Sequence, residues 1–415
     1  MSLTSDQVKI IKSTVPVLRE HGADITKTFY HTLLSEVPSL NDVFNQANQI
    51  NNHQANALAG ALYAYASHID DLGALEPAVE KICQKHASLY IKAEQYDIVG
   101  KYLLQAMGTV LGAALTKEIL DAWAVAYQQL ADVMIKREET LLRDAKPWTD
   151  WRDFVIDRKV KESEEITSFY FVPKDGQPLP KFLPGRYISI KTDVPLLKYD
   201  QSRQYSLSDA WSPEYYRISV KKEKGLPTAA ADAKYHPGYI SNVLHESKSE
   251  GDIIQMSHPF GEFFLDPEKN ADGPVVLVSA GVGLTPLLSM LNTLIAAKST
   301  RRISWIHATR GSSVQAFRQH IQKTCREHEN VHAVVFNKKP EPTDVEGLDY
   351  HHVGRLALNV LDRERDLFAN DAAASYFICG PEAFMKDMAR GFRAFGIDEA
   401  RIQMELFGTG AILPN

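Results

Sequence analysis

Two polar residues interrupt the apolar stripes of predicted helices in the first third of the chain. His86 has Ile82 four residues before it and Leu89 three residues after it, so its imidazole is expected to face the interior. Such a histidine is either a metal ligand or a hydrogen-bonded core residue. Glu138 lies four residues after Met134, on the buried side of the last predicted helix. Because a buried carboxylate needs hydrogen-bond partners, Glu138 belongs either to a polar cluster or to a frayed helix end.

A strand motif farther along the chain suits a flavin nucleotide. By period-two alternation Arg203 and Tyr205 lie on one face, where a guanidinium can bind phosphates and a ring can pack on the isoalloxazine. Downstream, Gly238 and Ser241 open a predicted helix whose N-terminus offers donors for a pyrophosphate. A motif this short also occurs in strands that bind no cofactor. Its four residues are Arg203, Gln204, Tyr205 and Ser206.

A glycine turn after a predicted buried strand suits a dinucleotide. Gly281 and Gly283 would let the backbone approach a phosphate, and Pro286 fits the first turn of the helix that follows. Pro286 stands near the place of the last glycine of the G-x-G-x-x-G pattern, so an ordinary strand-to-helix turn is the alternative. The turn consists of Gly281, Val282, Gly283, Leu284, Thr285 and Pro286.

The elements that must position these residues change character twice along the chain. Apolar residues first recur at helical spacing, which predicts an all-helical domain. Short alternating strands follow a junction in segment 146–154 and predict an antiparallel β-barrel. After Asp272 strands alternate with helices, which predicts an α/β domain with a parallel sheet. The expected domains are 1–145, 150–265 and 272–415.

The composition is that of a globular chain of 415 residues, with 44% apolar and 24% charged residues. A formal net charge of −6 argues against binding to nucleic acid or to a membrane surface. No apolar run reaches the ~18 residues of a membrane span. The first residues lack the pattern of a secretory or transit peptide, so we expect a cytoplasmic protein. The cysteines are too scattered for a disulfide framework or a cysteine-built metal site: Cys83, Cys325 and Cys379.

The helical part resembles the globin domain of flavohaemoglobins, and the rest of the chain follows the same domain order. The resemblance rests on the run KHASLYIKAEQYDIVGKYLL, which begins at Lys85, and on segments around Tyr30, Phe44 and Gln54. It implies that His86 is the proximal ligand of a haem iron. It also implies that Lys85 lies toward the flavin domain, although a solvated lysine would give the same sequence.

The same resemblance assigns the residues around the haem. Tyr96 and Glu138 would form a hydrogen-bonded relay with the proximal histidine, and such a relay makes the imidazole a stronger electron donor. Neighbouring helix positions point about 100° apart, so His53 and Gln54 should not both face the iron, and the family pattern selects Gln54. Phe44 would pack on the haem. The implied distal pocket consists of Tyr30, Gln54 and Leu58.

The remainder of the chain resembles the ferredoxin-reductase-like superfamily. The resemblance implies that the segments around Tyr187, Arg203 and Gly238 bind FAD, and it includes the G-x-G-x-T-P form of the glycine turn. Cys379 would lie near the nicotinamide. The aromatic residue of the C-terminal tail would cover the flavin, although Leu406 and Thr409 depart from the residues that are usual there. The tail segment consists of Glu405, Leu406, Phe407 and Gly408.

The resemblance implies a nitric oxide dioxygenase that uses haem b, FAD and NAD(P)H to oxidise NO to nitrate with O2. We expect it to act as a monomer. A haem protein that binds or senses oxygen, with a reductase that only keeps the iron ferrous, is one alternative. A general flavin reductase with a vestigial globin domain is another. After a predicted strand Arg310 and Ser312 follow without a carboxylate, which predicts that NADPH competes with NADH, whereas a solvated arginine is the simpler explanation.

Overall fold

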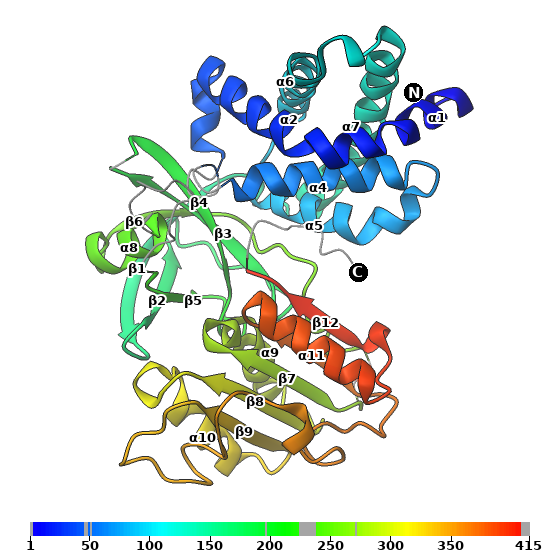
Figure 1. Ribbon diagram of the computed structural model, residues 1–415. Coiled ribbons are helices and arrows are strands. Elements are labelled where there is room, and N and C mark those ends of the chain that lie inside the picture. The colour runs from blue at the N-terminus through cyan, green and yellow to red at the C-terminus, as the bar shows by residue number, and fades with distance from the viewer. Residues whose placement is uncertain are drawn as a thin grey trace.

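The computed structural model describes residues 3–44, 49, 52–195, 197–223, 238–269 and 272–407. Its N-terminal part is helical, as expected (Figure 1). The first helix begins at a capping box, in which Thr4 and Gln7 satisfy each other's backbone N–H groups. The α-helices are α1 (Ser5–Ser13), α2 (Val15–Glu36), α4 (His53–Ser67), α5 (Glu76–Ser88), α6 (Ala93–Leu111) and α7 (Lys117–Asp144).

The helices of this part enclose one apolar core. Phe29 and Leu33 of α2 are buried against Leu103 of α6. The later helices α6 and α7 approach closely at Gly100, where a β-carbon would stand only 2.4 Å from the ring of Tyr127. The short turn η1 (Pro38–Asp42) follows α2 and contacts the next domain. In the same domain α5, which carries His86, lies beside α7, which carries Glu138.

The second part is an antiparallel barrel, as predicted. Its strand order is β4-β3-β6-β1-β2-β5, and a bridge between Leu207 and Ile218 joins the two outer strands. Arg152, within the expected junction, already begins β1, so the link between domains is shorter than the sequence suggested. The strands are β1 (Arg152–Lys161), β2 (Ile166–Pro173), β3 (Tyr187–Val194), β4 (Tyr199–Ser206), β5 (Tyr216–Lys221) and β6 (Ile253–Met256).

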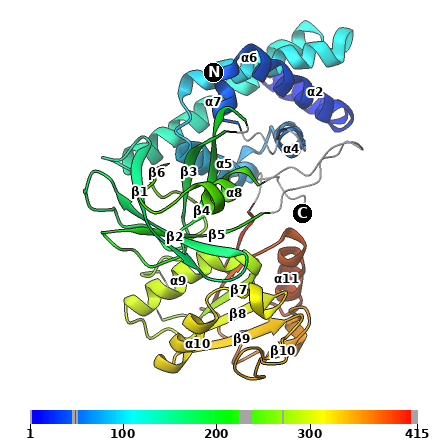
Figure 2. The ribbon, with the colours of Figure 1, turned by 90° about the vertical axis from the view of Figure 1, so that its left-hand side faces the viewer.

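The third part is a parallel sheet with the order β10-β9-β8-β7-β11-β12. Side chains of β7 alternate between two cores: Val275 and Leu277 pack with α9 and α10, whereas Val276 and Val278 face the core that contains α11. Figure 2 shows the sheet between these helices. The elements are β7 (Val275–Ala280), α9 (Leu284–Ala296), β8 (Ile303–Thr309), α10 (Arg318–Glu327), β9 (Val331–Asn337), β10 (His352–Val353), β11 (Ser375–Cys379), α11 (Glu382–Ala394) and β12 (Ile402–Glu405).

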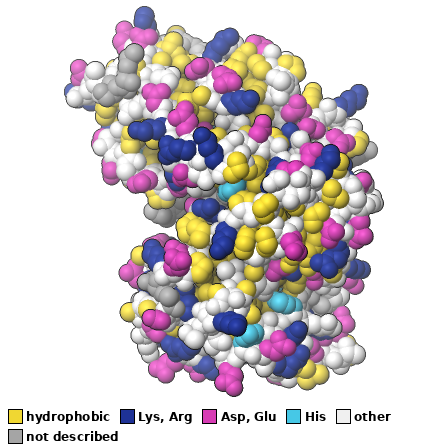
Figure 3. Space-filling model, turned by 180° about the vertical axis from the view of Figure 1, so that it is seen from behind, with side chains coloured by type: hydrophobic (Ala, Val, Ile, Leu, Met, Phe, Trp, Pro, Cys, Tyr) yellow, Lys and Arg dark blue, Asp and Glu magenta, His cyan; other side chains and the backbone are white. Residues whose placement is uncertain are grey.

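The barrel lies between the helical part and the parallel sheet (Figure 1). The C-terminal strand β12 pairs with β11 and leads back toward α5, so the end of the third part lies near the helical part. Acidic and basic side chains are interspersed over the face of the molecule in Figure 3. In the described part of the chain, no helix combines the length and apolar character needed to cross a membrane.

Candidate functional site

The structure brings the three predicted proximal residues into one hydrogen-bonded cluster. His86 Nδ1 lies 2.9 Å from Glu138 Oε1 and 2.9 Å from the hydroxyl of Tyr96. That hydroxyl donates to Glu138 Oε1 at 2.6 Å. The residues come from α5, α6 and α7, so the packing of three helices forms the cluster. Glu138 is only 4% exposed and α7 continues to Asp144, so this carboxylate is a buried partner rather than a frayed helix end.

The chemistry of this cluster fits a haem iron. Burial, and then the negative charge of Glu138, raise the pKa of Tyr96 well above its ordinary value, so the phenol keeps its proton and donates it in a hydrogen bond. With Nδ1 of His86 held by this pair, Nε2 is the ring nitrogen that can coordinate a metal. A neutral imidazole with a carboxylate behind it is the usual form of a ligating histidine.

The predicted distal residues also converge. Tyr30 of α2 is 7% exposed and its ring meets that of Phe44 edge to face at 5.5 Å between centroids. Its side chain is hydrogen-bonded to Gln54 of α4, and burial raises the pKa of Tyr30 so that it remains a neutral donor. Leu58, one helical turn beyond Gln54, packs against the same core. His53 is exposed, which agrees with the expectation that it and Gln54 face different sides.

The flavin motif lies on β4, beside β3. Ser206 pairs with Tyr187, which is half-buried, and Gln204 pairs with Ser189. Burial lowers the pKa of Arg203 to about 10, and an anionic phosphate beside it would favour the charged form again. This guanidinium therefore fits the pyrophosphate of a flavin nucleotide. Tyr205, two residues on, interacts with it electrostatically, as expected for the same strand face.

The predicted pyrophosphate helix is short. Gly238 precedes α8 (Tyr239–Asn242), which continues only into the turn η4 (Val243–Ser247). Ser241 already uses its hydroxyl: it donates to the Gly238 carbonyl at 2.9 Å and accepts from the N–H of Glu223 at 3.2 Å. Gly238 itself is tightly packed, since a β-carbon there would lie 2.7 Å from Glu223. Ser241 thus braces the segment that leads into α8.

Sequence reasoning missed a buried chain of hydrogen bonds between the flavin strand and the proximal helix. Gln204 Nε2 donates to Ser189 Oγ at 3.0 Å, Ser189 donates to Ser88 Oγ at 2.8 Å, and Ser88 donates to the carbonyl of Lys85 at 2.7 Å. Other hydrogen bonds between the barrel and the helical part include Gly261 N–H to Gln84 Oε1 at 2.9 Å and His258 N–H to the Tyr90 hydroxyl at 3.0 Å. Serine and glutamine are too common for their spacing to predict such contacts.

Lys85, expected from the resemblance to lie toward the flavin domain, is half-buried close to this boundary. Burial, with help from the neighbouring positive charge of Arg203, lowers the pKa of its ammonium group to about 8. Nearby, Nζ of Lys81 lies 3.8 Å from Oε1 of Glu405, the last residue of β12. The C-terminal tail therefore reaches the helical part across the barrel, a contact between residues far apart in the sequence.

The glycine turn connects β7 to α9 and lies against the end of β11. Gly281 has φ +56°, a conformation that favours glycine. A β-carbon on Gly283 would lie 2.3 Å from the carbonyl oxygen of Cys379, so only glycine allows this approach. Cys379 is fully buried at that point. Thr285 donates to the carbonyl of Val282 at 3.1 Å, and Leu284 begins α9 with Pro286 in its first turn. The N-terminus of α9 thus lies directly after the glycine turn, an arrangement that suits a phosphate.

The C-terminal tail forms a strand that the sequence did not predict. Glu405, the last residue of β12, is 9% exposed, and burial raises its pKa to about 7. Leu406 is half-buried, and the ring of Phe407 is 45% exposed. Gly408 lies outside the described residues. The ring of Phe407 is thus exposed, as is required of a residue that packs over a planar cofactor.

The residues expected to choose between NADH and NADPH have carboxylate neighbours that the sequence did not suggest. Arg310 is exposed and forms an ion pair with Glu165 of the barrel. Ser312 donates to Asp344, which also pairs with Arg318 at 3.0 Å. Both acids come from other parts of the chain, so the lack of a carboxylate directly after β8 does not describe the full surroundings of Arg310 and Ser312.

Comparisons with known proteins agree with this arrangement. The globin family model matches residues 27–134, and the oxidoreductase NAD-binding domain model matches residues 277–390. A flavohemoprotein of Bordetella parapertussis is 45% identical over 409 residues, 97% of this chain and 98% of that protein. A flavohemoprotein of Halalkalibacterium halodurans is 40% identical over 416 residues, 99% of this chain and 98% of that protein.

Two solved structures are also similar. The flavohemoglobin of Malassezia yamatoensis, with bound FAD and heme, has a TM-score of 0.83 and 28% identity over 98% of this chain and 100% of that one. The FAD/NAD binding domain of nitric oxide dioxygenase from Vibrio cholerae has a TM-score of 0.54 and 33% identity, over 62% of this chain and 99% of that one. The chain therefore belongs to the flavohemoprotein family, as a globin joined to an oxidoreductase with a flavin barrel and an NAD-binding domain.

Proposed function

We propose that the protein is a nitric oxide dioxygenase, which oxidises NO to nitrate with O2 and takes the electrons from NAD(P)H. The observation that carries the proposal is the buried cluster in which His86 Nδ1 lies 2.9 Å from both Tyr96 and Glu138. A relay of this kind strengthens the proximal ligand as an electron donor, which catalysis on oxygen needs more than reversible oxygen carriage does. The similarity to the FAD/NAD binding domain of nitric oxide dioxygenase from Vibrio cholerae supports the same activity.

The proposal assigns a haem to the helical domain, with His86 as its iron ligand, and FAD and NAD(P)H to the rest of the chain. When bound, these groups supply hydride acceptance, single-electron transfer and oxygen binding. Within the chain, Glu138 and Tyr96 hold the imidazole in one tautomer and orientation. On the other side, the buried Tyr30 and the half-buried Gln54 offer a hydroxyl and an amide as hydrogen-bond donors.

The reductase residues have binding and positioning roles in this proposal. Arg203 holds the flavin phosphates, while Tyr187 and Tyr205 contact the flavin ring. The turn Gly281–Pro286 binds the phosphates of the nicotinamide nucleotide. Cys379 would lie near the nicotinamide, and Phe407 would cover the flavin. We propose the domains 1–145, 150–265 and 272–415, and a monomer that works in the cytoplasm on the small molecules NO and O2.

Aerobic NO consumption by the purified protein, with nitrate measured as product, tests the proposal. Consumption that needs NAD(P)H, yields nitrate and is lost in His86→Ala supports it. Ferricyanide reduction should remain in that variant, since it needs only the reductase part. Reversible oxygen binding without nitrate formation would instead identify an oxygen carrier or sensor. Unchanged physiological turnover in His86→Ala would identify a general flavin reductase.

A further inference from the structure

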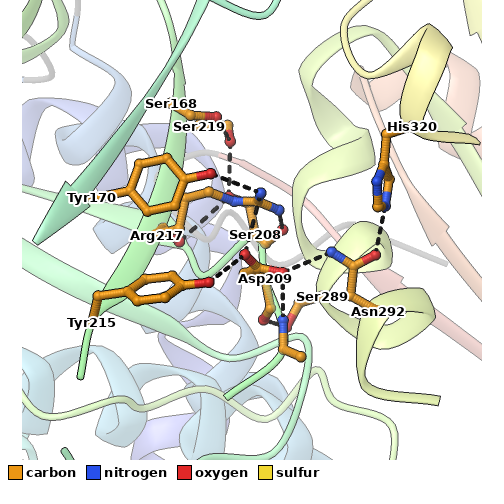
Figure 4. A network of polar contacts seen from close by, with 11 residues as sticks. Ser168, Tyr170, Ser208, Asp209, Tyr215, Arg217, Ser219, Ser289, Asn292 and His320 are labelled. Carbon is orange, nitrogen blue, oxygen red and sulfur yellow. Dashed lines mark hydrogen bonds and ion pairs between the residues drawn. The ribbon is translucent and has the colours of Figure 1, made fainter. Parts of the chain in front are cut away.

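A buried polar network joins the barrel to the nucleotide domain at Asp209, three residues beyond the flavin motif (Figure 4). Its Oδ1 accepts from Asn292 Nδ2 at 2.8 Å, and its backbone carbonyl accepts from Ser289 Oγ at 2.7 Å. Both partners lie on α9, the helix that begins directly after the glycine turn. One residue of the barrel therefore holds two residues of the nucleotide-binding helix.

Asp209 is itself held from the barrel side. Its Oδ2 lies 3.2 Å from Arg217 Nη1 and accepts from the hydroxyl of Tyr215 at 3.2 Å. The guanidinium of Arg217, only 8% exposed, also donates to both the carbonyl and the hydroxyl of Ser208. Both carboxylate oxygens of Asp209 thus have partners, and these partners hold the turn after β4 in one conformation. Buried charge pairs of this kind contribute more to fixing a geometry than to stability.

The orientation of the Asn292 amide is also determined. His320 of α10 lies with Nε2 2.8 Å from Asn292 Oδ1 (Figure 4). The amide oxygen therefore faces the histidine, and its NH2 group faces Asp209. This network joins the turn after β4 and strand β5 of the barrel to helices α9 and α10.

The consequence concerns the distance between the two redox cofactors. Ser206 and Asp209 belong to the same short segment, so the flavin strand moves with Asp209. Leu284 and Ser289 are five residues apart on one helix, so the glycine turn moves with Ser289. We propose that Asp209 is a positioning residue, which through Ser289 and Asn292 sets the approach of the nicotinamide to the flavin.

This inference rests on the proposed function only for the transfer of hydride from NAD(P)H to a flavin. In that transfer the C4–H bond of the dihydronicotinamide breaks and an N5–H bond forms on the flavin, and the electron pair moves with the hydrogen. The nicotinamide is oxidised and the flavin is reduced. The rate of such a step is sensitive to misplacement of about 1 Å. Binding of the nucleotide phosphates, which occurs at the turn itself, is much less sensitive.

The test uses the full-length holoprotein under nitrogen, without NO or O2, so that it is independent of dioxygenase activity. Flavin reduction is followed by stopped flow against nucleotide concentration in Ser289→Ala, Asn292→Ala and the double variant. The double variant should reduce flavin at least about tenfold more slowly, with its Kd for the nucleotide changed less than about twofold. Thr293→Ala, also on α9 but outside the network, is the matched control and should behave as the parent protein.

Two measurements separate positioning from general damage. The long-wavelength charge-transfer absorbance of reduced flavin with NAD(P)+ should weaken in the double variant, while flavin content stays at the parent level. In the apoprotein, hydrogen exchange at the first turns of α9 should become faster than in Thr293→Ala. Ser289→Ala, which removes a single neutral hydrogen bond, keeps the test available if the double variant does not fold. Flavin reduction at the parent rate in all three variants would overturn the proposal, whereas a parent protein inert to both nucleotides would overturn the proposed function.

Discussion

The hydroxyl of Ser189 donates a hydrogen bond to the hydroxyl of Ser88 at 2.8 Å, across the boundary between β3 of the barrel and α5 of the globin domain. Ser88 lies two residues from His86, and Ser189 accepts from Gln204 of the flavin motif. The hydroxyl of Ser88 in turn donates a hydrogen bond to the carbonyl of Lys85. The proposed flavin and haem sites are thus joined by one chain of hydrogen bonds.

This relationship predicts the effect of Ser189→Ala. Loss of the hydroxyl should lower the free energy of unfolding by about 1 kcal/mol, because Gln204 and Ser88 each lose a partner. Haem reduction, followed at the Soret band under carbon monoxide, should slow severalfold, whereas flavin reduction by NAD(P)H should not change. Thr192→Ala, on the same strand, serves as the control. Equal haem reduction in both variants would show that the chain does not hold the two cofactor sites together.

Tyr30→Phe tests the distal pocket. Loss of one hydrogen bond to bound oxygen should speed oxygen dissociation about fivefold, which corresponds to about 1 kcal/mol. Oxygen replacement by carbon monoxide in a stopped-flow experiment measures this rate. Tyr102→Phe removes a hydroxyl that bonds Glu36 elsewhere in the globin domain and should have no effect. An unchanged oxygen dissociation rate in Tyr30→Phe would show that Tyr30 does not hydrogen-bond the bound oxygen.

Glu138→Gln tests the proximal relay. The amide fills the same space but lacks the charge that makes the imidazole a strong donor, so NO turnover should fall about tenfold or more. Haem content should stay close to that of the parent protein. Glu139→Gln changes the adjacent exposed carboxylate and is the matched control. A variant with full turnover would restrict Glu138 to a structural role.

Glu405 should make stability depend on pH. Burial raises its pKa to about 7, so the folded state retains a proton that the unfolded state has already released. Its contribution to stability is therefore present at about pH 4 and is lost as the pH rises to about 7. Urea unfolding of the flavin-free full-length protein at several pH values should show this loss, of up to about 3 kcal/mol. Glu405→Gln should not show it, and parallel pH profiles for the two proteins would contradict the assignment.

The nucleotide preference should depend on the ion pair between Arg310 and Glu165. If Arg310 binds a 2′-phosphate, Arg310→Ala should lower kcat/KM for NADPH severalfold and leave the value for NADH unchanged. Glu165→Gln should act in the opposite direction, because it frees the guanidinium. Arg302→Ala alters another exposed arginine of the same domain and provides the comparison. A strong preference for NADH that Arg310→Ala leaves unchanged would refute the hypothesis of NADPH use.

The sequence alone indicated those features that depend on local spacing. The inward direction of His86 follows from apolar neighbours at helical intervals, and the glycine turn follows from residues that are adjacent in the chain. The order of an all-helical domain, an antiparallel barrel and a parallel sheet follows from the same local periodicities, and the structure confirms it. The short strand with Arg203 and Tyr205 on one face could also be predicted, because side chains alternate between the two faces of a strand.

Only the tertiary structure decided which distant residues meet. The approach of Glu138 to His86 depends on how α5 packs against α7, and residues 52 positions apart carry no shared local pattern. Ser189 reaches Ser88, and Asp209 reaches Asn292, across domain boundaries that no periodicity describes. The physical reason is that local structure reflects interactions within a few residues, whereas these contacts arise only when separate apolar faces are buried against one another.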